Sequence, residues 1–264
     1  MTSETAQPAY AVNQFRDPAA EIARLAQQAA ILAATEEDVL RALGLPERGR
    51  ALDLGCGPGF VAARIAKARP SLKIVGLDRD IDVLRKAHAL VAGAGGQADG
   101  LPFPDACFDA VFARLVLRHL PRPEAALAEM YRVLRPGGRA IVIDSDDGAL
   151  VMHPPVPAFA GALAAREATF RRAGADPFIG RRLPELFAAA GFVEPAFRPL
   201  VVDSTSIGLA AFVRVVLSPI ADAIDADLLD GAGVDRAVAA LDAWASSPSA
   251  FGMTTVVAYG GTRR

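Results

Sequence analysis

Buried strands and amphipathic helices alternate along the middle of the chain. Short apolar runs with few charges predict strands over 50–54, 73–78, 109–113 and 139–144. Apolar residues at helical spacing between them predict helices over 60–68, 80–91 and 123–134, the second capped by Asp80. Gly93, Gly95 and Gly96 leave only a weak third strand in this series. Strands that alternate with helices predict a parallel sheet of the α/β class.

Two helices are predicted before the first strand. Asp17 followed by Pro18 is typical of a helix start, and the helix carries apolar residues at Ile22, Leu25, Ala26, Ala29 and Ile31. The pair Thr35 and Asp38 resembles a capping box, which predicts a second helix ending at Leu43 before Gly44. We expect residues 1–48 to form an N-terminal helical lid.

The alternation loosens after residue 144. The pattern predicts a loop and one helix over 145–178, a helix over 181–190, a strand over 197–203, two or three helices over 206–247 and a last strand over 251–259. Breaks among the later helices are expected near Pro219 and Gly231. We therefore expect a core over 49–204 with a cap insertion at about 145–178, a second helical cap over 205–249 and a final core strand in 250–264.

Composition limits the possible partners. Of the 264 residues 52% are hydrophobic and 22% charged, which suits a sizeable core, and the net charge of -2 argues against a nucleic-acid partner. Cys56 and Cys107 show neither a disulfide framework nor metal-ligand spacing. The N-terminus lacks a signal-peptide pattern, and prolines in the uncharged stretch 148–165 exclude a membrane helix there. These features predict a cytoplasmic protein without a metal or a membrane partner.

The most informative stretch follows the first predicted strand, where Asp53-Leu54-Gly55-Cys56-Gly57-Pro58-Gly59 forms a glycine loop. Glycines at alternate positions permit a tight turn and the close approach of a ligand. Asp78 ends the second predicted strand, where a doubly wound sheet places the carboxylate that binds a ribose. The sequence therefore predicts a nucleoside site.

The loop disfavours a dinucleotide. Its glycine spacing is G-x-G-x-G rather than G-x-G-x-x-G, and Pro58 lacks an N–H that a phosphate would use. Asp53 would repel a pyrophosphate, whereas it can accept a hydrogen bond from an ammonium group. The loop thus suits a ligand with a cationic amino-acid end and no phosphate.

These residues resemble motif I of the class I S-adenosylmethionine-dependent methyltransferases. The stretches 102–109 and 132–139 resemble the segments before strands four and five of the small-molecule, UbiE-like members, and the resemblance covers about 50–203 and the last strand. It implies a doubly wound, Rossmann-like, mostly parallel seven-stranded sheet with an antiparallel last strand and helical lid and cap insertions. It also implies S-adenosyl-L-methionine as cofactor and methyl transfer to O, N, C or S of a small molecule, in specialised metabolite biosynthesis.

The resemblance implies a set of cofactor contacts. Gly55, Gly57 and Gly59 would approach the methionine part and ribose, and Asp78 would accept from the ribose hydroxyls. The remaining expected contacts are Asp53, Cys56, Arg79, Gln97, Ala98 and Arg114. Gln97 stands where the family has an Asp beside the adenine amino group, with Asp99 as the alternative. Arg114 would meet either the cofactor or an acidic substrate.

Two histidines are the catalytic candidates. His119 follows strand four, with a structural role as the alternative, and His153 lies in a proline-rich loop after strand five. Asp144, Asp146 and Asp147 would orient a substrate, or form a solvated acidic loop. The acceptor is expected to be apolar or aromatic, because the cap segments carry Phe159, Phe170, Phe178, Phe212 and Trp244. A homodimer is a candidate assembly.

Three alternatives remain open from the sequence. The first is a quinone-pathway C-methyltransferase, and the second is a catalytically silent module that binds S-adenosylmethionine. The third, a nicotinamide dehydrogenase, is disfavoured by the glycine spacing.

Overall fold

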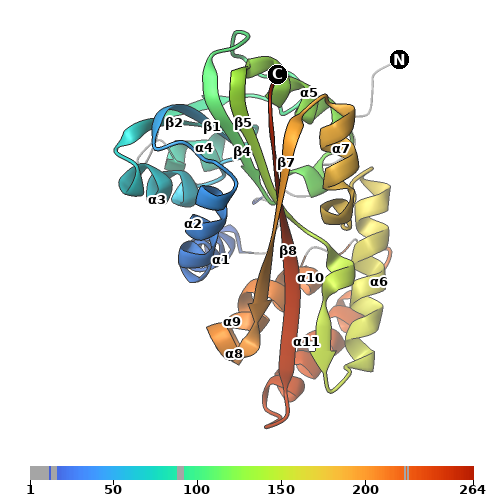
Figure 1. Ribbon diagram of the computed structural model, residues 1–264. Coiled ribbons are helices and arrows are strands. Elements are labelled where there is room, and N and C mark those ends of the chain that lie inside the picture. Colours follow the sequence, from blue (N-terminus) through green and yellow to red (C-terminus); the bar gives the residue numbers. More distant parts are fainter. Residues whose placement is uncertain (1–11, 13–16, 88–91, 223, 225) are drawn as a thin grey trace, which may run out of the picture.

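The computed structural model describes residues 12, 17–87, 92–222, 224 and 226–264. Within these ranges an eight-stranded sheet forms the centre of the molecule (Figure 1). Its strands are β1 (Arg48–Leu54), β2 (Ser71–Asp78), β3 (Ala92–Gly95), β4 (Phe108–Arg114), β5 (Leu134–Ser145), β6 (Val151–His153), β7 (Val193–Asp203) and β8 (Phe251–Thr262).

The sheet reverses its strand order beside β1. The order is β3-β2-β1-β4-β5-β8, with β7 and β6 also paired to β8. Strands β1 to β5 are parallel to one another, while β8 is antiparallel to β5 and to β7. The chain therefore has the expected Rossmann-like doubly wound architecture, whose carboxyl-end crevice at the reversal point is the usual place for a ligand.

Alternate residues of the central strands enter two different cores. Leu52 and Val111 belong to a cluster with α5 (Pro123–Val133) and α7 (Leu183–Ala189). Their neighbours Ala51 and Ala110 belong to a second cluster with α2 (Ala33–Ala42) and α3 (Phe60–Ala68). Because both faces of these strands are buried, their sequences are apolar runs rather than alternating patterns.

A third apolar cluster lies at the other end of the molecule, where Figure 1 shows α6, α8, α9, α10 and α11 around the far half of β8. These helices span Pro157–Arg172, Ser204–Ile207, Leu209–Phe212, Ser218–Asp222 and Gly231–Ala245. Phe159, Phe212 and Trp244 are buried in this cluster. The long strand β8 joins the two ends, because it pairs with β5 along one half and with β6 at the other end.

Most predicted elements are present within a few residues of their expected ends. The N-terminal helix α1 (Pro18–Ile31) begins as expected, with Asp17 accepting hydrogen bonds from the backbone N–H groups of Ala19 and Ala20. Asp80 caps α4 (Ile81–Ala87), and the remainder of that prediction, 88–91, lies outside the described residues.

Other local predictions were wrong. Helix α2 begins at Ala33 without a side-chain cap, so Thr35 and Asp38 form no capping box. Only Leu32 separates α1 from α2. The apolar face of α2 packs into the second core cluster, and this packing takes the place of a side-chain cap. Pro219 does not interrupt the helices here. A π-helical segment (Val213–Leu217) runs directly into α10, and Pro219 lies in the first turn of α10, where a proline is tolerated. The sheet has eight strands rather than the expected seven, because the short strand β6, which pairs with the end of β8, was not predicted.

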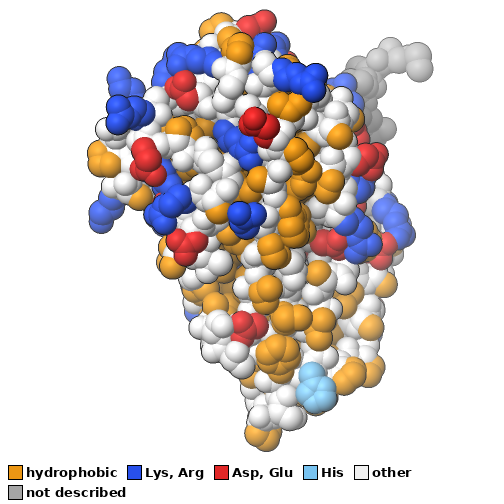
Figure 2. All heavy atoms as spheres, in the orientation of Figure 1, with side chains coloured by type: hydrophobic (Ala, Val, Ile, Leu, Met, Phe, Trp, Pro, Cys, Tyr) orange, Lys and Arg blue, Asp and Glu red, His pale blue; other side chains and the backbone are white. Residues whose placement is uncertain are grey.

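The exposed face of β7 is rich in apolar side chains. Figure 2 shows hydrophobic side chains gathered along this part of the surface, and Phe197 and Val201 of β7 are about half exposed. Over the described ranges, no helix has both the length and the apolar character needed to cross a membrane.

Candidate cofactor and acceptor site

The glycine loop connects β1 to α3 in a backbone conformation that side chains disfavour. Gly55 and Gly57 have φ values of 71° and 52°, in the left-handed region. A Cβ on Gly55 would lie 2.5 Å from Cγ2 of Val116, so the loop packs closely against the segment after β4. A Cβ on Gly57 would meet nothing within 4 Å, because this residue borders open space.

Asp78 holds the loop in place from the end of β2. Its Oδ2 accepts a hydrogen bond from the backbone N–H of Gly57 at 2.8 Å, and its Oδ1 accepts one from that of Asp80 at 2.9 Å. The carboxylate thus lies at the carboxyl ends of β1 and β2, as predicted, and it lines the cavity described next.

A cavity of about 330 Å³ begins at this loop. It is lined by nine of the predicted site residues: Asp53, Gly55, Cys56, Gly57, Asp78, Arg79, Ala98, Arg114 and His119. Its size lies at the small end of the range for ligand pockets, about 300–1,000 Å³. The structure therefore brings most of the predicted constellation together.

Three predicted residues do not line the cavity. Gly59 is the N-cap of α3. Gln97 forms an isolated bridge with Gly100, while its neighbours Gly96 and Ala98 reach the cavity wall. His153 is exposed in β6, and its backbone carbonyl accepts a hydrogen bond from Nε1 of Trp244 at 3.1 Å. The structure does not bring His153 to the other candidates.

The loop end of the cavity is rich in carboxylates. Burial raises the pKa of Asp53 well above its usual value, and the nearby Asp78 adds to the shift. Burial also raises the pKa of the Cys56 thiol, which therefore stays protonated and is no nucleophile at neutral pH.

An ion pair that the sequence did not predict ties the N-terminal helices to this end. Glu36 of α2 is 1% exposed and accepts a hydrogen bond from Nε of Arg114 at 2.5 Å and one from Nη2 of Arg64 at 2.9 Å. Gln28 of α1 accepts a further bond from Arg114 at 3.1 Å. Arg114 at the end of β4 therefore binds α1 and α2 rather than facing solvent.

The backbone after Arg114 is unusual. Leu115 lies on the cavity wall with φ of 56°, and its N–H donates to the carbonyl of Ile143 at 2.8 Å. A non-glycine residue in this region is uncommon and often marks a functional segment.

The opposite end of the cavity is rich in arginine. Arg118 is 6% exposed; it donates to both carboxylate oxygens of Asp147, at 2.8 and 2.9 Å, and to Oγ of Ser145. Nε of Arg166 donates to the same Asp147 at 3.2 Å. The guanidinium groups of Arg118 and Arg166 both lie over the Phe170 ring, at 4.9 and 4.8 Å from its centre.

His119 lies beside this arginine pair. It is partly buried on the cavity wall, and its ring centre is 5.3 Å from that of Phe170. Burial lowers its pKa well below the usual value, and the charge of Arg118 lowers it further. His119 is therefore neutral at physiological pH.

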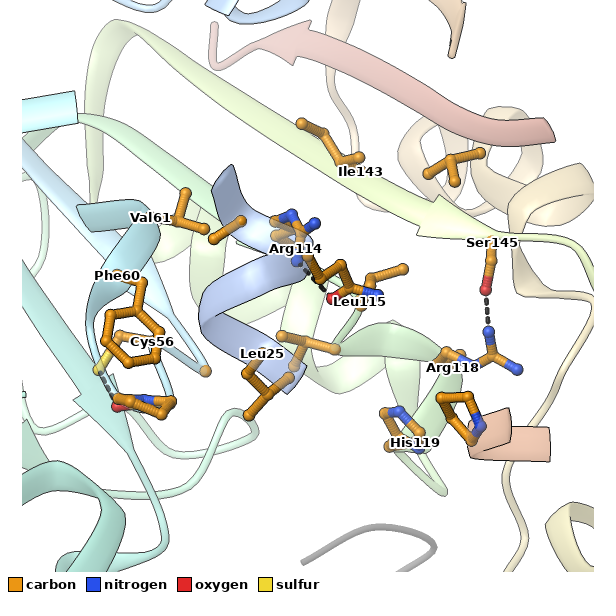
Figure 3. A pocket seen from close by; sticks show the side chains of 18 of the residues that line it. Leu25, Cys56, Phe60, Val61, Arg114, Leu115, Arg118, His119, Ile143 and Ser145 are labelled. Atoms are coloured by element: carbon orange, nitrogen blue, oxygen red, sulfur yellow. Dashed lines mark hydrogen bonds between the residues drawn. The ribbon is translucent and has the colours of Figure 1, made fainter. Parts of the chain in front are cut away.

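Figure 3 shows the two ends of the site in one view. Cys56 and Phe60 lie on one side, Arg118, His119 and Ser145 on the other, and Arg114 and Leu115 between them. Between the ends, the wall also includes apolar side chains from helices far away in the sequence, among them Leu25, Ala29, Val215, Val216 and Ile220.

The residues present fit S-adenosylmethionine at the loop end. Gly57 leaves open space for a ligand, and the carboxylates of Asp53 and Asp78 suit an ammonium group and hydroxyl groups respectively. Among the described residues no group of three or more His, Cys, Asp or Glu side chains is placed to hold a metal ion.

The geometry is that of a Rossmann-like nucleoside-binding enzyme, and comparisons with known proteins identify the class. A family model described as "Methyltransferase domain" matches residues 52–142. The C-methyltransferase UbiE of ubiquinone/menaquinone biosynthesis from Desulfotalea psychrophila is 30% identical over 186 residues, which are 64% of this chain and 76% of that protein. A demethylmenaquinone methyltransferase from Geobacillus kaustophilus is 32% identical over 184 residues, 62% of this chain and 79% of its own.

A solved structure extends the likeness to the fold. A putative methyltransferase from an antibiotic biosynthesis pathway of Anabaena variabilis matches with a TM-score of 0.64 and 17% identity, over 86% of this chain and 96% of that one. At this identity the match concerns the fold alone. The sequence matches show more: the chain belongs to the class I S-adenosylmethionine-dependent methyltransferase family. It is a methyltransferase whose cofactor is S-adenosyl-L-methionine.

Proposed function

We propose that the chain methylates a small, largely apolar organic molecule held between the glycine loop and the helices of the cap. One observation carries the proposal: a single cavity runs from Gly57 and Asp78 to an apolar wall made of α1, the π-helical segment and the inner face of β7 and β8. The inner face contributes Leu200, Val202, Thr254 and Val256. A cavity of about 330 Å³ is of the size that small-molecule ligands occupy.

We also propose the residue roles at the cofactor end. Asp78 accepts from the ribose hydroxyls, Asp53 from the ammonium group, and the backbone of Gly55 to Gly57 follows the methionine part. Ala98 and the adjacent Gln97 border the adenine. S-adenosylmethionine supplies an activated methyl group, so the protein's task is to align the acceptor and exclude water.

The caps and the lid provide that exclusion. The segments 145–178 and 205–249, which we propose as acceptor caps, pack around their own apolar cluster and supply Phe170, Val215 and Ile220 to the cavity wall. The N-terminal lid, residues 1–48, closes another side through Leu25, Ala29 and the Glu36–Arg114 pair. A homodimer and a cytoplasmic location stay predictions.

A second candidate is C-methylation of a quinone precursor. It is favoured by the names of the relatives, which are C-methyltransferases of ubiquinone or menaquinone biosynthesis and demethylmenaquinone methyltransferases. Demethylmenaquinone therefore belongs in the first panel of acceptors, beside simple phenols, thiols and amines.

The first experiment is calorimetric titration with S-adenosylmethionine and S-adenosylhomocysteine. We expect micromolar binding, weakened at least tenfold by Asp78→Ala. Unchanged affinity in the variant would refute the proposed role of Asp78. Formation of S-adenosylhomocysteine with any acceptor rejects the silent binding module.

Two neighbouring residues of β8 test the acceptor chamber. Thr254 lines the cavity and pairs with Val202, whereas Thr255 does not line it and pairs with Val201, which is 54% exposed. We expect Thr254→Phe to fill the chamber and lower turnover at least tenfold while S-adenosylhomocysteine still binds, and Thr255→Phe to retain turnover. Equal effects of the two variants would contradict the proposed position of the acceptor.

A further inference from the structure

The two ends of the cavity carry opposite charge. The loop end presents the carboxylates of Asp53, Asp78 and Asp80, whereas the far end presents Arg118 and Arg166 around Asp147. A cofactor with a cationic amino-acid end suits the acidic loop end. The arginine-rich far end suits a ligand group with a negative charge.

At the far end of the cavity, the two guanidinium groups of Arg118 and Arg166 face only one carboxylate on the cavity wall, that of Asp147. Arg118 and Arg166 share the single carboxylate of Asp147, and both are at least nine-tenths buried. The other acceptors for their N–H groups are neutral oxygens, Oγ of Ser145 and the carbonyl of Pro219. Among the described residues, Nε of Arg118 has no hydrogen-bond partner. Unpaired buried charge is costly, so a site of this kind favours an anion.

Neighbouring carboxylates do not supply the missing charge. Asp144 is fully buried, does not line the cavity, and accepts backbone N–H groups of Arg118 and Ser145. Burial raises the pKa of Asp144 to about 6, so the group is mostly ionised at neutral pH, but its oxygens accept from backbone N–H groups and not from the guanidinium groups of Arg118 or Arg166. Asp146 forms its ion pair with Arg181, and neither residue lines the cavity.

The remaining neighbours add no net charge. Arg24 of α1 also lines the cavity, but it donates to both carboxylate oxygens of the buried Glu21, each at 2.7 Å. Burial lowers the pKa of Arg166 to about 10, and the charges of Arg118 and Arg24 add to the shift. His119 is neutral and adds no charge.

We propose that the methyl acceptor is an organic monoanion whose carboxylate binds the Arg118–Arg166 pair. This inference rests on the proposed function and specifies its substrate class. Planar guanidinium groups match a carboxylate, and the surplus of one positive charge matches one carboxylate rather than a doubly charged phosphate. The apolar wall then holds the body of the acceptor, and the carboxylate fixes its orientation toward the loop end.

The test uses protein saturated with S-adenosylhomocysteine and two probes of equal shape, benzoate and its neutral analogue benzamide. We expect calorimetry to show benzoate binding at least tenfold tighter than benzamide. The variant Arg166→Met should remove this preference, while Asp147→Asn, which removes the shared counter-charge, should tighten benzoate binding severalfold. The two variants are expected to change benzoate affinity in opposite directions. Recognition of an anion is thereby distinguished from a loss of folding, which would weaken binding in both variants.

Arg181→Met is the matched control. Arg181 also pairs with an aspartate, Asp146, and also lies over a phenylalanine ring, that of Phe178 at 5.0 Å, but it does not line the cavity. It should leave benzoate binding unchanged.

Three results would overturn the inference: equal affinity for benzoate and benzamide, no loss in Arg166→Met, or benzoate competing with S-adenosylhomocysteine. The last would mean that the arginine pair holds the carboxylate of the cofactor. Since binding of S-adenosylhomocysteine is measured separately, failure of the proposed cofactor site is distinguished from failure of this inference.

Discussion

The carboxylate of Asp78 is the contact on which the conformation of the glycine loop depends most directly. Its two oxygens accept from two different backbone N–H groups, Oδ2 from Gly57 at 2.8 Å and Oδ1 from Asp80 at 2.9 Å. Asp78→Asn keeps the size of the side chain but provides one acceptor oxygen and one NH₂ group. In either orientation the NH₂ group faces a backbone N–H.

The magnitude follows from these two contacts. One charge-assisted hydrogen bond, with a net value of about 1.5–3 kcal/mol, is lost, and the other becomes neutral, which costs about 1 kcal/mol more. Because Asp78 is only half-buried, water compensates part of the loss. We expect the free energy of unfolding to fall by about 2–3 kcal/mol.

The assay is urea unfolding followed by circular dichroism, with Asp80→Asn as the matched control. A single oxygen of Asp80 accepts from both Asp82 and Val83 at the start of α4, and Asn caps helices as well as Asp does. The control should lose less than about 0.5 kcal/mol. If Asp78→Asn were as stable as Asp80→Asn, the carboxylate would not be holding the loop.

Three further predictions concern buried ionisable groups. Arg114→Leu leaves the buried Glu36 with Arg64 and should cost about 2–4 kcal/mol in urea unfolding, whereas Arg41→Leu, at a 63% exposed side chain, should cost less than about 0.5 kcal/mol; equal losses would contradict the buried pair. Burial raises the pKa of Asp144 to about 6 in the folded protein, so this group stabilises most below about pH 4 and the contribution is lost as pH rises through 6. The stability difference between wild type and Asp144→Asn should fall by about 3 kcal/mol between about pH 3 and pH 7, and a flat difference would show that the pKa is not raised. Because burial and the charge of Arg118 lower the pKa of His119 and make it a weak base, His119→Ala should lower kcat by less than about a hundredfold and leave the pH–rate profile unchanged between pH 6 and 8; a larger loss with intact cofactor binding would make His119 the general base.

Local patterns predicted the central elements well. The helix over 60–68 and the strands that became β1, β2, β4 and β5 follow from short apolar runs separated by turns, because strands buried on both faces require such runs. The glycine loop and Asp78 were predicted for the same reason: their roles depend on backbone conformation and on position at strand ends. Backbone conformation and position at a strand end are both set by residues that are adjacent in the sequence.

Features that depend on partners distant in sequence were missed. Nothing in the sequence marked Arg118 as buried, yet it is 6% exposed, because it donates hydrogen bonds to Ser145 at the end of β5 and to Asp147 in the segment after it. Glu36 carries no local sign of burial, since its partner Arg114 is 78 residues away. His153 looked suited to the acceptor site, but the pairing of β6 with β8 places it outside the cavity.

The sequence by itself determined the class of this protein: an alternating α/β core, a glycine loop for a nucleoside with a cationic end, and an acidic residue after the second strand. These features are set by residues within one strand, turn or helix. Only the tertiary structure decided the cavity that we propose for the acceptor and the charges on its wall, because α1, the segment after β4, α6 and the π-helical segment meet there only when the chain folds. Whether an arginine side chain is exposed or buried therefore depends on how these segments pack against one another.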